Sequence, residues 1–480
     1  MSKVLQGLKP EKVFYYFEEI SKIPRGSGNE KEISDYLYNL AINKGWDVIQ
    51  DDYLNIIIKK PASKGYENAP TVMLQGHMDM VCEKNEGIVH DFEKDPIKLR
   101  IIDDCIYATE TTLGADNGIA VAMALAILDS DELVHPSIEV LITTDEEKGM
   151  TGAQRLDGSI FNSKYLLNLD SEEEGIFTCG CAGGCEAILE IPIKLQNIKE
   201  KNTYKLMIKG LSGGHSGTDI DKEKGNANKI LARILYDLKD EIDLVSINGG
   251  SKTNAIPREA SAKITILNLE SVKNKVVEWN DILKSEYAFT DKSISVLLIE
   301  NNTKEVPLDK EIFNKVISAI NLTPNGVLSK STEIDLVVCS NNLGVITTDE
   351  ESIKLYNQAR SSVKTLLTHS FEQTIKQIGD ILNIKCKVGN YYPGWEYAKD
   401  SKIRNICIET YKEMYGKEPQ IEAIHAGLEC GLLMEKIDSL DAISFGPDAW
   451  EVHSPNEHIS IKSIDNIYKL TCEILKRIKN

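Results

Sequence analysis

The sequence has 480 residues, and its 55 Lys and Arg stand against 74 Asp and Glu, which gives a formal net charge of −19 at pH 7. With 42% hydrophobic residues it has enough apolar side chains for a large core, and its length predicts more than one domain. The acidity argues against nucleic acid or an anionic membrane as a partner, since both are bound through basic surfaces.

Residues 10–45 carry apolar side chains at helical spacing, and the pattern then changes to short apolar runs that alternate with helices. Strands are expected at 71–74, 138–143 and 165–169, with an apolar helix at 119–128. That helix is the longest apolar run, and it is well short of the roughly 20 residues that span a bilayer. Buried strands that alternate with helices are typical of a largely parallel sheet in an α/β domain.

A different pattern occupies residues 186–396. Segments 204–209, 262–268 and 353–360 alternate apolar and polar residues, as half-exposed antiparallel strands do, and helices are expected at 226–238 and 365–382. The first pattern then returns, with an apolar run at 442–445. The sequence therefore predicts an α/β domain made of residues 1–185 and 397–480, interrupted by an inserted α+β domain of residues 186–396.

Histidines and carboxylates follow four of the expected strands, and one more carboxylate precedes the helix at 119–128. These residues are His77, Asp79, Asp116, Glu146, Glu147, Asp170 and His453. Ligands of open α/β sheets bind outside the carboxyl ends of the strands, so we expect these side chains to converge on one crevice.

Imidazole and carboxylate ligands without a thiolate suit zinc, cobalt or manganese. So many carboxylates in one place would repel one another and raise their own pKa values, a conflict that two divalent cations would remove. A carboxylate shared by two ions about 3.5–4 Å apart is a feature of hydrolytic two-metal sites. The thiols of Cys179, Cys181 and Cys185 form a weaker candidate for zinc, because no fourth ligand lies beside them.

The acidic pair Glu146-Glu147 belongs to the string TTDEE at 143–147, which occurs again at 347–351. The second copy lies between two alternating segments and predicts a hairpin turn. The string alone is therefore uninformative, and its position after a buried strand distinguishes the first copy.

Taken together, the segments resemble the di-zinc metallopeptidase superfamily and, within it, the cytosolic aminoacyl-histidine (Xaa-His, carnosine-type) dipeptidases. The resemblance is carried by GHMDMVCEKN at 76–85, TTLGADNGIAVAMALAIL at 111–128, TTDEEKGMTGA at 143–153, LLNLDSEEEG at 166–175, GGHSG at 213–217, HAGLECG at 425–431 and GPDAWEVHSPNE at 446–457. It implies a discontinuous catalytic domain with an inserted lid, and a cytoplasmic exopeptidase that hydrolyses Xaa-His and other short peptides by metal-activated water.

The resemblance also implies a role for each residue of the crevice. Asp116 would bridge two divalent ions, with Zn²⁺ as the first candidate and Co²⁺ or Mn²⁺ as alternatives. His77 and Asp170 would complete one metal site, and Glu147 and His453 would complete the other. Asp79 would orient His77, and Glu146 would be the general base.

The inserted domain resembles the lid of this superfamily. His215 would donate to the substrate carbonyl or its oxyanion, and Asn254 and Arg360 would hold the peptide, with Arg360 on its terminal carboxylate. His425 and Glu429 would face the other end, where Glu429 would attract the free ammonium. His215 could act within its own chain or on a partner, so monomer and homodimer both remain open.

Two rival functions stay open at this point. An N-acyl amino-acid deacylase or a tripeptidase could use the same two ions, because they would serve any amide. A catalytically silent binding protein could keep the same fold. The other histidines have no motif around them, and we expect structural roles for His90, His135, His369 and His458.

Overall fold

The computed structural model describes residues 3–332 and 336–479. The chain divides into two compact units, one of residues 1–180, 397–423 and 428–480, and the other of residues 181–396 and 424–427. The second unit thus begins at residue 181, whereas the sequence placed the boundary at 186, and it also takes up the short segment 424–427. Among the described residues, no helix combines the length and the apolar character needed to cross a bilayer.

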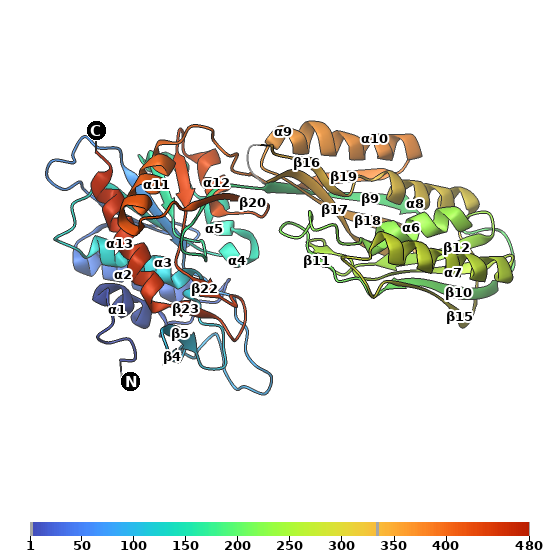
Figure 1. Cartoon of the computed structure of the whole chain (residues 1–480), viewed down its shortest axis with the longest axis horizontal. Helices are drawn as coiled ribbons and strands as arrows, with labels where there is room; N and C mark the ends of the chain where they lie inside the picture. Colours follow the sequence, from blue (N-terminus) through green and yellow to red (C-terminus); the bar gives the residue numbers. More distant parts are fainter. Residues whose placement is uncertain (1–2, 333–335, 480) are drawn as a thin grey trace. The chain divides into compact units, whose positions relative to one another are not determined.

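The first unit is built on an eight-stranded sheet (Figure 1), and its four central strands are parallel. In spatial order the strands are β1 (Asp47–Gln50), β2 (Ile56–Lys60), β6 (Ile138–Thr143), β3 (Val72–His77), β7 (Tyr165–Asn168), β21 (Asp441–Ser444), β8 (Ile176–Cys181) and β20 (Gln420–Ile424). The strands β1 and β2 pair antiparallel on one flank. All residues of β3 and β6 are buried, which explains their continuous apolar runs and confirms the expected α/β class.

Helices pack around this sheet. The unit also contains a small four-stranded sheet, whose strands have the spatial order β22-β23-β5-β4. The helices are α1 (Glu11–Ile20), α2 (Lys31–Lys44), α3 (Ala115–Leu128), α4 (Glu146–Gly149), α5 (Thr151–Arg155), α11 (Lys402–Tyr415), α12 (Glu429–Lys436) and α13 (Ile461–Arg477), with a 3₁₀ turn at Gly158–Ile160. The small sheet consists of β4 (Leu99–Ile102), β5 (Cys105–Ala108), β22 (Ala449–Trp450) and β23 (His458–Ser460). The helical character expected over 10–45 is confirmed as two helices, α1 and α2, which a loop with Pro24, Gly26 and Gly28 separates.

The buried helix α3 fixes the position of Asp116, which lies in its first turn. It packs against α1 and β3, and every residue in it except Asp116 is buried. Its apolar surface runs all the way round, which is typical of a helix in the centre of a large core. Asp116 lies in the first turn, two residues after Gly114, whose backbone is left-handed (φ 66°). It is therefore a polar residue at the N-terminal end of a helix that the core holds in place.

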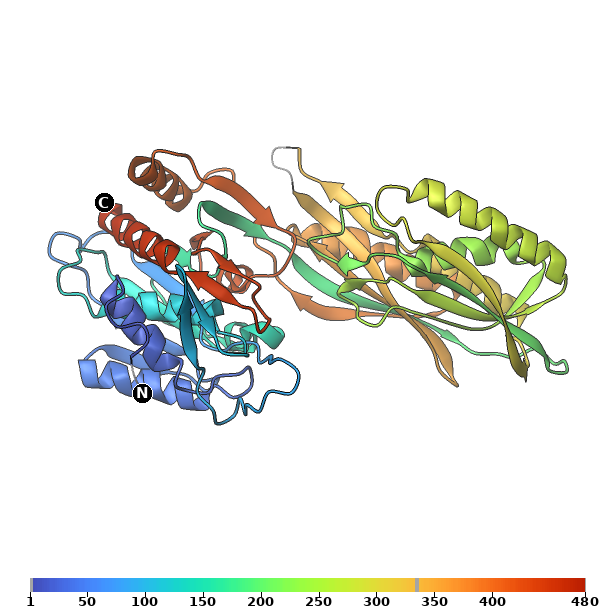
Figure 2. The ribbon, with the colours of Figure 1, turned by 60° about the horizontal axis from the view of Figure 1, so that its bottom comes forward.

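The second unit holds a nine-stranded antiparallel sheet with helices packed on it (Figure 2). Its strands are β9 (Gly183–Pro192), β10 (Lys201–Lys209), β12 (Ile242–Gly249), β14 (Ala260–Ile266), β15 (Ser295–Glu305), β16 (Gly326–Lys330), β17 (Val337–Thr348), β18 (Ser352–Ser361) and β19 (Lys385–Tyr392). Its helices are α6 (Ala227–Leu238), α7 (Leu269–Glu286), α8 (Lys310–Leu322), α9 (Lys364–Leu366) and α10 (Glu372–Leu382), with a π turn at Leu367–Phe371. A short pair, β11 (Gly214–His215) and β13 (Ala255–Ile256), completes it.

Burial alternates along β10, β14 and β18, as the sequence predicted for strands with one covered face. The second copy of TTDEE lies at the end of β17 and in its turn to β18, so the predicted hairpin is confirmed.

Candidate functional site

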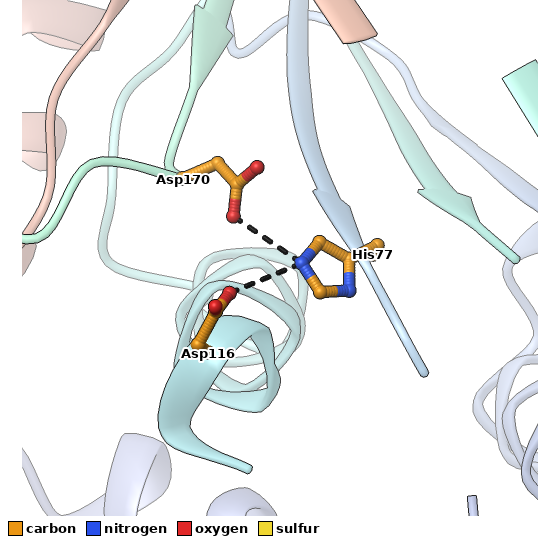
Figure 3. A group of neighbouring side chains, drawn as sticks. All are labelled: His77, Asp116 and Asp170. Carbon is orange, nitrogen blue, oxygen red and sulfur yellow. Dashed lines mark hydrogen bonds and ion pairs between the residues drawn. The ribbon is translucent and has the colours of Figure 1, made fainter. Parts of the chain in front are cut away.

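The first ligand candidate, His77, is the last residue of β3, and its side chain is 1% exposed. Its Nδ1 lies 3.1 Å from the main-chain oxygen of Asp79, which can only accept a hydrogen bond. Nδ1 therefore carries a proton, and Nε2 faces the crevice. There Nε2 lies 3.1 Å from Asp116 Oδ1 and 3.4 Å from Asp170 Oδ1 (Figure 3).

The two carboxylate oxygens of Asp116 face two different histidines. Oδ1 faces His77, and Oδ2 lies 3.0 Å from Nε2 of His453. His453 lies in the loop between β22 and β23, and its Nε2 is also 3.0 Å from Glu147 Oε2. A single carboxylate thus joins two clusters, which is the arrangement expected of a bridging ligand.

The potential metal ligands fall into three overlapping groups whose ligating atoms all lie within 4.8 Å of one another. These groups are His77 with Asp116 and Asp170, His77 with Glu146 and Glu147, and Asp116 with Glu147 and His453. No cysteine takes part in any such group among residues 3–332 and 336–479. Cys179, Cys181 and Cys185 are instead buried in β8 and β9, so the weaker zinc candidate has no support.

Asp79 is fully buried and ties the strand β3 to the start of α4. Its Oδ1 lies 3.4 Å from His77 Nδ1 and accepts from the Glu146 N–H at 3.1 Å, while Oδ2 accepts from the Glu147 N–H at 3.3 Å. Ser27 Oγ donates to Oδ2 at 2.8 Å. Burial would raise the pKa of Asp79, but hydrogen bonds from His77, Ser27 and the Glu146 N–H outweigh it and lower the pKa.

Burial and neighbouring charges shift the pKa values of the ionisable side chains in the crevice. Burial raises the pKa of Asp170 to about 6, with Asp116 and Glu147 adding to the effect against the opposing charge of His77. Burial also raises the pKa of Glu146 well above its usual range. Hydrogen bonds to Asp116 and Glu147 raise the pKa of His453 to about 11. The imidazoles thus favour the ionised form of the carboxylates around them, while burial and neighbouring carboxylates oppose it.

The arrangement fits divalent cations. Two imidazole Nε2 atoms and several carboxylate oxygens point at common positions, and the bridging Asp116 separates them into two sets. The donors are the borderline and hard ligands of zinc, cobalt and manganese, and cations would neutralise the repulsion that raises the carboxylate pKa values.

Comparison with known proteins identifies the family. Residues 73–477 match the family described as peptidase family M20/M25/M40. The chain belongs to this family. It is therefore a hydrolase of peptide bonds, and the resemblance to the di-zinc metallopeptidases is confirmed.

Two relatives match over nearly the whole chain. The chain is 38% identical over 480 residues to the cytosol non-specific dipeptidase of Escherichia coli K12, covering 99% of each. It also superimposes on the crystal structure of the aminoacylhistidine dipeptidase of Vibrio alginolyticus with a TM-score of 0.92 and 37% identity, covering 99% of this chain and 98% of the other. The aminopeptidase PepT of Bacillus cereus, at 16% identity and a TM-score of 0.57 over 98% of this chain and 99% of the other, shares the fold.

Four of the residues predicted to contact substrate lie in the second unit, namely His215, Asn254, Arg360 and His425. Nδ1 of His215 accepts from the Gly217 and Thr218 N–H groups, each at 3.3 Å, so in the neutral ring Nε2 carries the proton. Burial and the charge of Arg360 lower the pKa of His215, which keeps the ring neutral at pH 7. Burial, with Arg360 and His215 nearby, lowers the pKa of His425 to about 4.

Arg360, His425 and Asn254 each have hydrogen-bond partners within this unit. Arg360 on β18 donates to the Tyr392 hydroxyl at 2.9 Å, and His425 Nε2 lies 2.7 Å from Ser340 Oγ. Asn254 is exposed, and its carbonyl accepts from the Ser216 N–H at 2.9 Å beside the β11–β13 pair.

Glu429 lies in the first unit at the start of α12 and is 0% exposed. Its Oε2 accepts from Gln75 Nε2 at 2.5 Å and Thr143 Oγ1 at 2.6 Å. Burial raises its pKa to about 7. Glu429 is thus shielded from solvent, and its role toward a substrate ammonium stays a prediction.

Sequence reasoning missed the residues that support these ligands from behind. Arg25, Asn117 and Glu457 are buried polar side chains that hydrogen-bond the segments carrying Asp116 and Asp170. Asn117 and Glu457 lie inside the quoted motifs, so their position next to a ligand was the available signal. Arg25 follows a proline in an irregular loop, where no periodic pattern marks a buried residue.

Proposed function

We propose that the protein is a cytoplasmic metallo-dipeptidase that hydrolyses Xaa-His and other short peptides with two divalent ions, Zn²⁺ first among them. The observation that carries this proposal is the position of Asp116, with one oxygen toward His77 and the other toward His453. The names of the two full-length relatives support a dipeptidase, and that of the first supports the cytosol.

The bound ions would polarise the peptide carbonyl and lower the pKa of a coordinated water. We assign His77, Asp116 and Asp170 to one ion and Asp116, Glu147 and His453 to the other. Asp79 would keep Nε2 of His77 turned toward the crevice, because its main-chain oxygen holds the Nδ1 proton.

Glu146 would act as the general base. Its main-chain N–H is bound by Asp79, so the residue is fixed at the start of α4 between the two ligand sets. Burial raises its pKa, which suits a group that accepts a proton from water and then delivers it to the leaving amine.

The lid residues would hold the peptide. His215 presents an Nε2 proton in its neutral form and would donate it to the carbonyl oxygen as negative charge develops there. Arg360 would bind the terminal carboxylate through its planar guanidinium, with Asn254 and His425 as further contacts.

A substrate panel on protein with counted metal ions tests the proposal. We expect Ala-His and β-Ala-His to be hydrolysed faster than a tripeptide and an N-acetyl amino acid. Preference for the N-acetyl amino acid would identify a deacylase, and preference for the tripeptide a tripeptidase. No turnover with two ions bound would support a silent binding protein.

A further inference from the structure

Glu457 is a buried carboxylate with no role assigned so far. It lies in the first unit with 2% of its surface exposed. Its Oε2 accepts from the N–H groups of Leu113 at 2.7 Å and Gly114 at 2.9 Å, and its Oε1 from those of Ala115 at 2.7 Å and Asp116 at 3.3 Å. With four donors the carboxylate is saturated, so it is not itself a free metal ligand.

The four donors form the segment that delivers Asp116 to the site. Gly114 has φ 66°, and a Cβ there would lie 2.5 Å from Nη2 of Arg25 and 2.7 Å from Sδ of Met80. The fully buried Arg25 donates to the Gly114 carbonyl at 2.5 Å and to the Met78 carbonyl at 2.9 Å. The main chain of Gly114 is thus held at its N–H by Glu457 and at its carbonyl by Arg25.

Glu457 also ends the loop that carries His453. Its own N–H donates to the Ser454 carbonyl at 3.0 Å, and Ser454 Oγ donates to the Glu451 carbonyl at 2.7 Å, which closes the loop into a compact turn. His453 inside this turn has φ 61°, a left-handed backbone position. One side chain therefore fastens the segment of Asp116 to the loop of His453, although the two ligands are far apart in sequence.

The other ligands have supports of their own. His77 is fixed by the main-chain oxygen of Asp79, and Asn117 Nδ2 donates to the Leu169 carbonyl at 3.0 Å, just before Asp170. Glu147 is held through its N–H by Asp79. Among these ligands, only Asp116 and His453 depend on Glu457 for their mutual position in the part of the chain that the structure describes.

We propose that Glu457 is a positioning residue that holds Asp116 and His453 together and thereby sets the affinity of the second ion, the one bound by Asp116, Glu147 and His453. This inference rests on the proposed two-ion site. Partners behind metal ligands commonly change metal affinity by about 10–100-fold when they are altered. The loss should fall on this ion more than on the ion at His77 and Asp170.

The test is a metal titration of the apoprotein against a chromophoric chelator, with bound zinc counted per chain. Glu457→Gln keeps the shape of the side chain but places an amide where two N–H groups require an acceptor. We expect wild type to bind two ions, and Glu457→Gln to keep one at near wild-type affinity while binding the other about 10–100-fold more weakly. Activity of the variant should then return as the zinc concentration is raised.

Glu139→Gln is the matched control. Glu139 is 3% exposed in the same unit, and it too accepts main-chain N–H groups, those of Asn162 and Ser163. It lies in β6 and touches none of the proposed ligands. We expect Glu139→Gln to lower the melting temperature and to leave both zinc affinities unchanged.

The outcomes separate the inference from the proposed function. Fewer than two ions on wild type would defeat the two-ion site itself. Two ions of unchanged affinity on Glu457→Gln, or an equal loss of both ions in Glu457→Gln and Glu139→Gln, would overturn the role of Glu457. If Glu457→Gln does not fold, Glu457→Asp provides the same test, because it keeps the charge but shortens the reach, and the same selective loss is expected.

Discussion

His425 should make the protein less stable in mild acid. It belongs to the second unit, is 6% exposed, and has Nε2 2.7 Å from Ser340 Oγ. Burial, together with the charges of Arg360 and His215, lowers its pKa from the ordinary 6.5 to about 4. The folded chain therefore keeps this imidazole neutral where an unfolded chain would protonate it.

The sign and size of the effect follow from the two pKa values. The unfolded chain binds a proton at this imidazole near pH 6.5, and the folded chain binds it only near pH 4, so between them the unfolded state holds more protons. The free energy of unfolding therefore falls as the pH is lowered through this window. With about 1.4 kcal/mol per pKa unit, the loss from His425 is about 2 kcal/mol at pH 5 and approaches about 3 kcal/mol below pH 4.

Urea unfolding between pH 4.5 and 8, with a chelator present throughout, measures the effect. Trp279 and Trp395 belong to the second unit, whereas Trp46 and Trp450 belong to the first, so replacing the latter two with Phe makes the fluorescence specific for the second unit. His425→Gln removes the titration. Its difference in unfolding free energy from the parent should shift by about 2 kcal/mol in its favour between pH 8 and pH 5.

A pH-independent difference for His425→Gln would refute the reasoning, because the imidazole would then titrate alike in the folded and unfolded chains.

Three further predictions concern the crevice. Glu146→Gln should lower kcat by about 10²–10⁴-fold, because no group would take the proton from water, while zinc analysis still finds the wild-type number of ions; turnover near wild type would remove Glu146 as the base. His77→Ala should lose the zinc ion that we assign to His77, Asp116 and Asp170, which equilibrium dialysis measures as bound zinc per chain. Full retention of zinc would exclude His77 as a ligand. Gly114→Ala should lower the free energy of unfolding in urea by at least about 1–2 kcal/mol, because φ is 66° and the new Cβ would meet Arg25; an unchanged midpoint would show that this turn is not constrained.

The strands that carry the site could be predicted from the sequence because they are buried on both faces. In β3, β6 and β7 nearly every residue is apolar or buried, so each strand appears as a continuous run that ends where its polar ligand begins. His77 and Asp170 could be found because they lie at the end of β3 and just after β7, where these runs stop. Asp116 could be found because it precedes the all-apolar helix α3.

The supports behind the ligands could not be predicted in the same way. Glu457, Arg25 and Asn117 make their hydrogen bonds to main-chain groups, and any sequence can provide those groups. Their effect depends on tertiary contacts between segments separated by 344 residues, as between Leu113 and Glu457. The break between α1 and α2 was missed for a related reason, since the helical spacing resumes after the loop as if it had not been interrupted.

The central claim is that Asp116 bridges two cations within one chain. Anomalous diffraction at the zinc absorption edge from crystals of the zinc-loaded protein tests it most directly. The account predicts two peaks about 3.5–4 Å apart, one beside His77 and Asp170 and the other beside Glu147 and His453, with an oxygen of Asp116 at each. A single peak, or two peaks too far apart for one carboxylate to span, would contradict it.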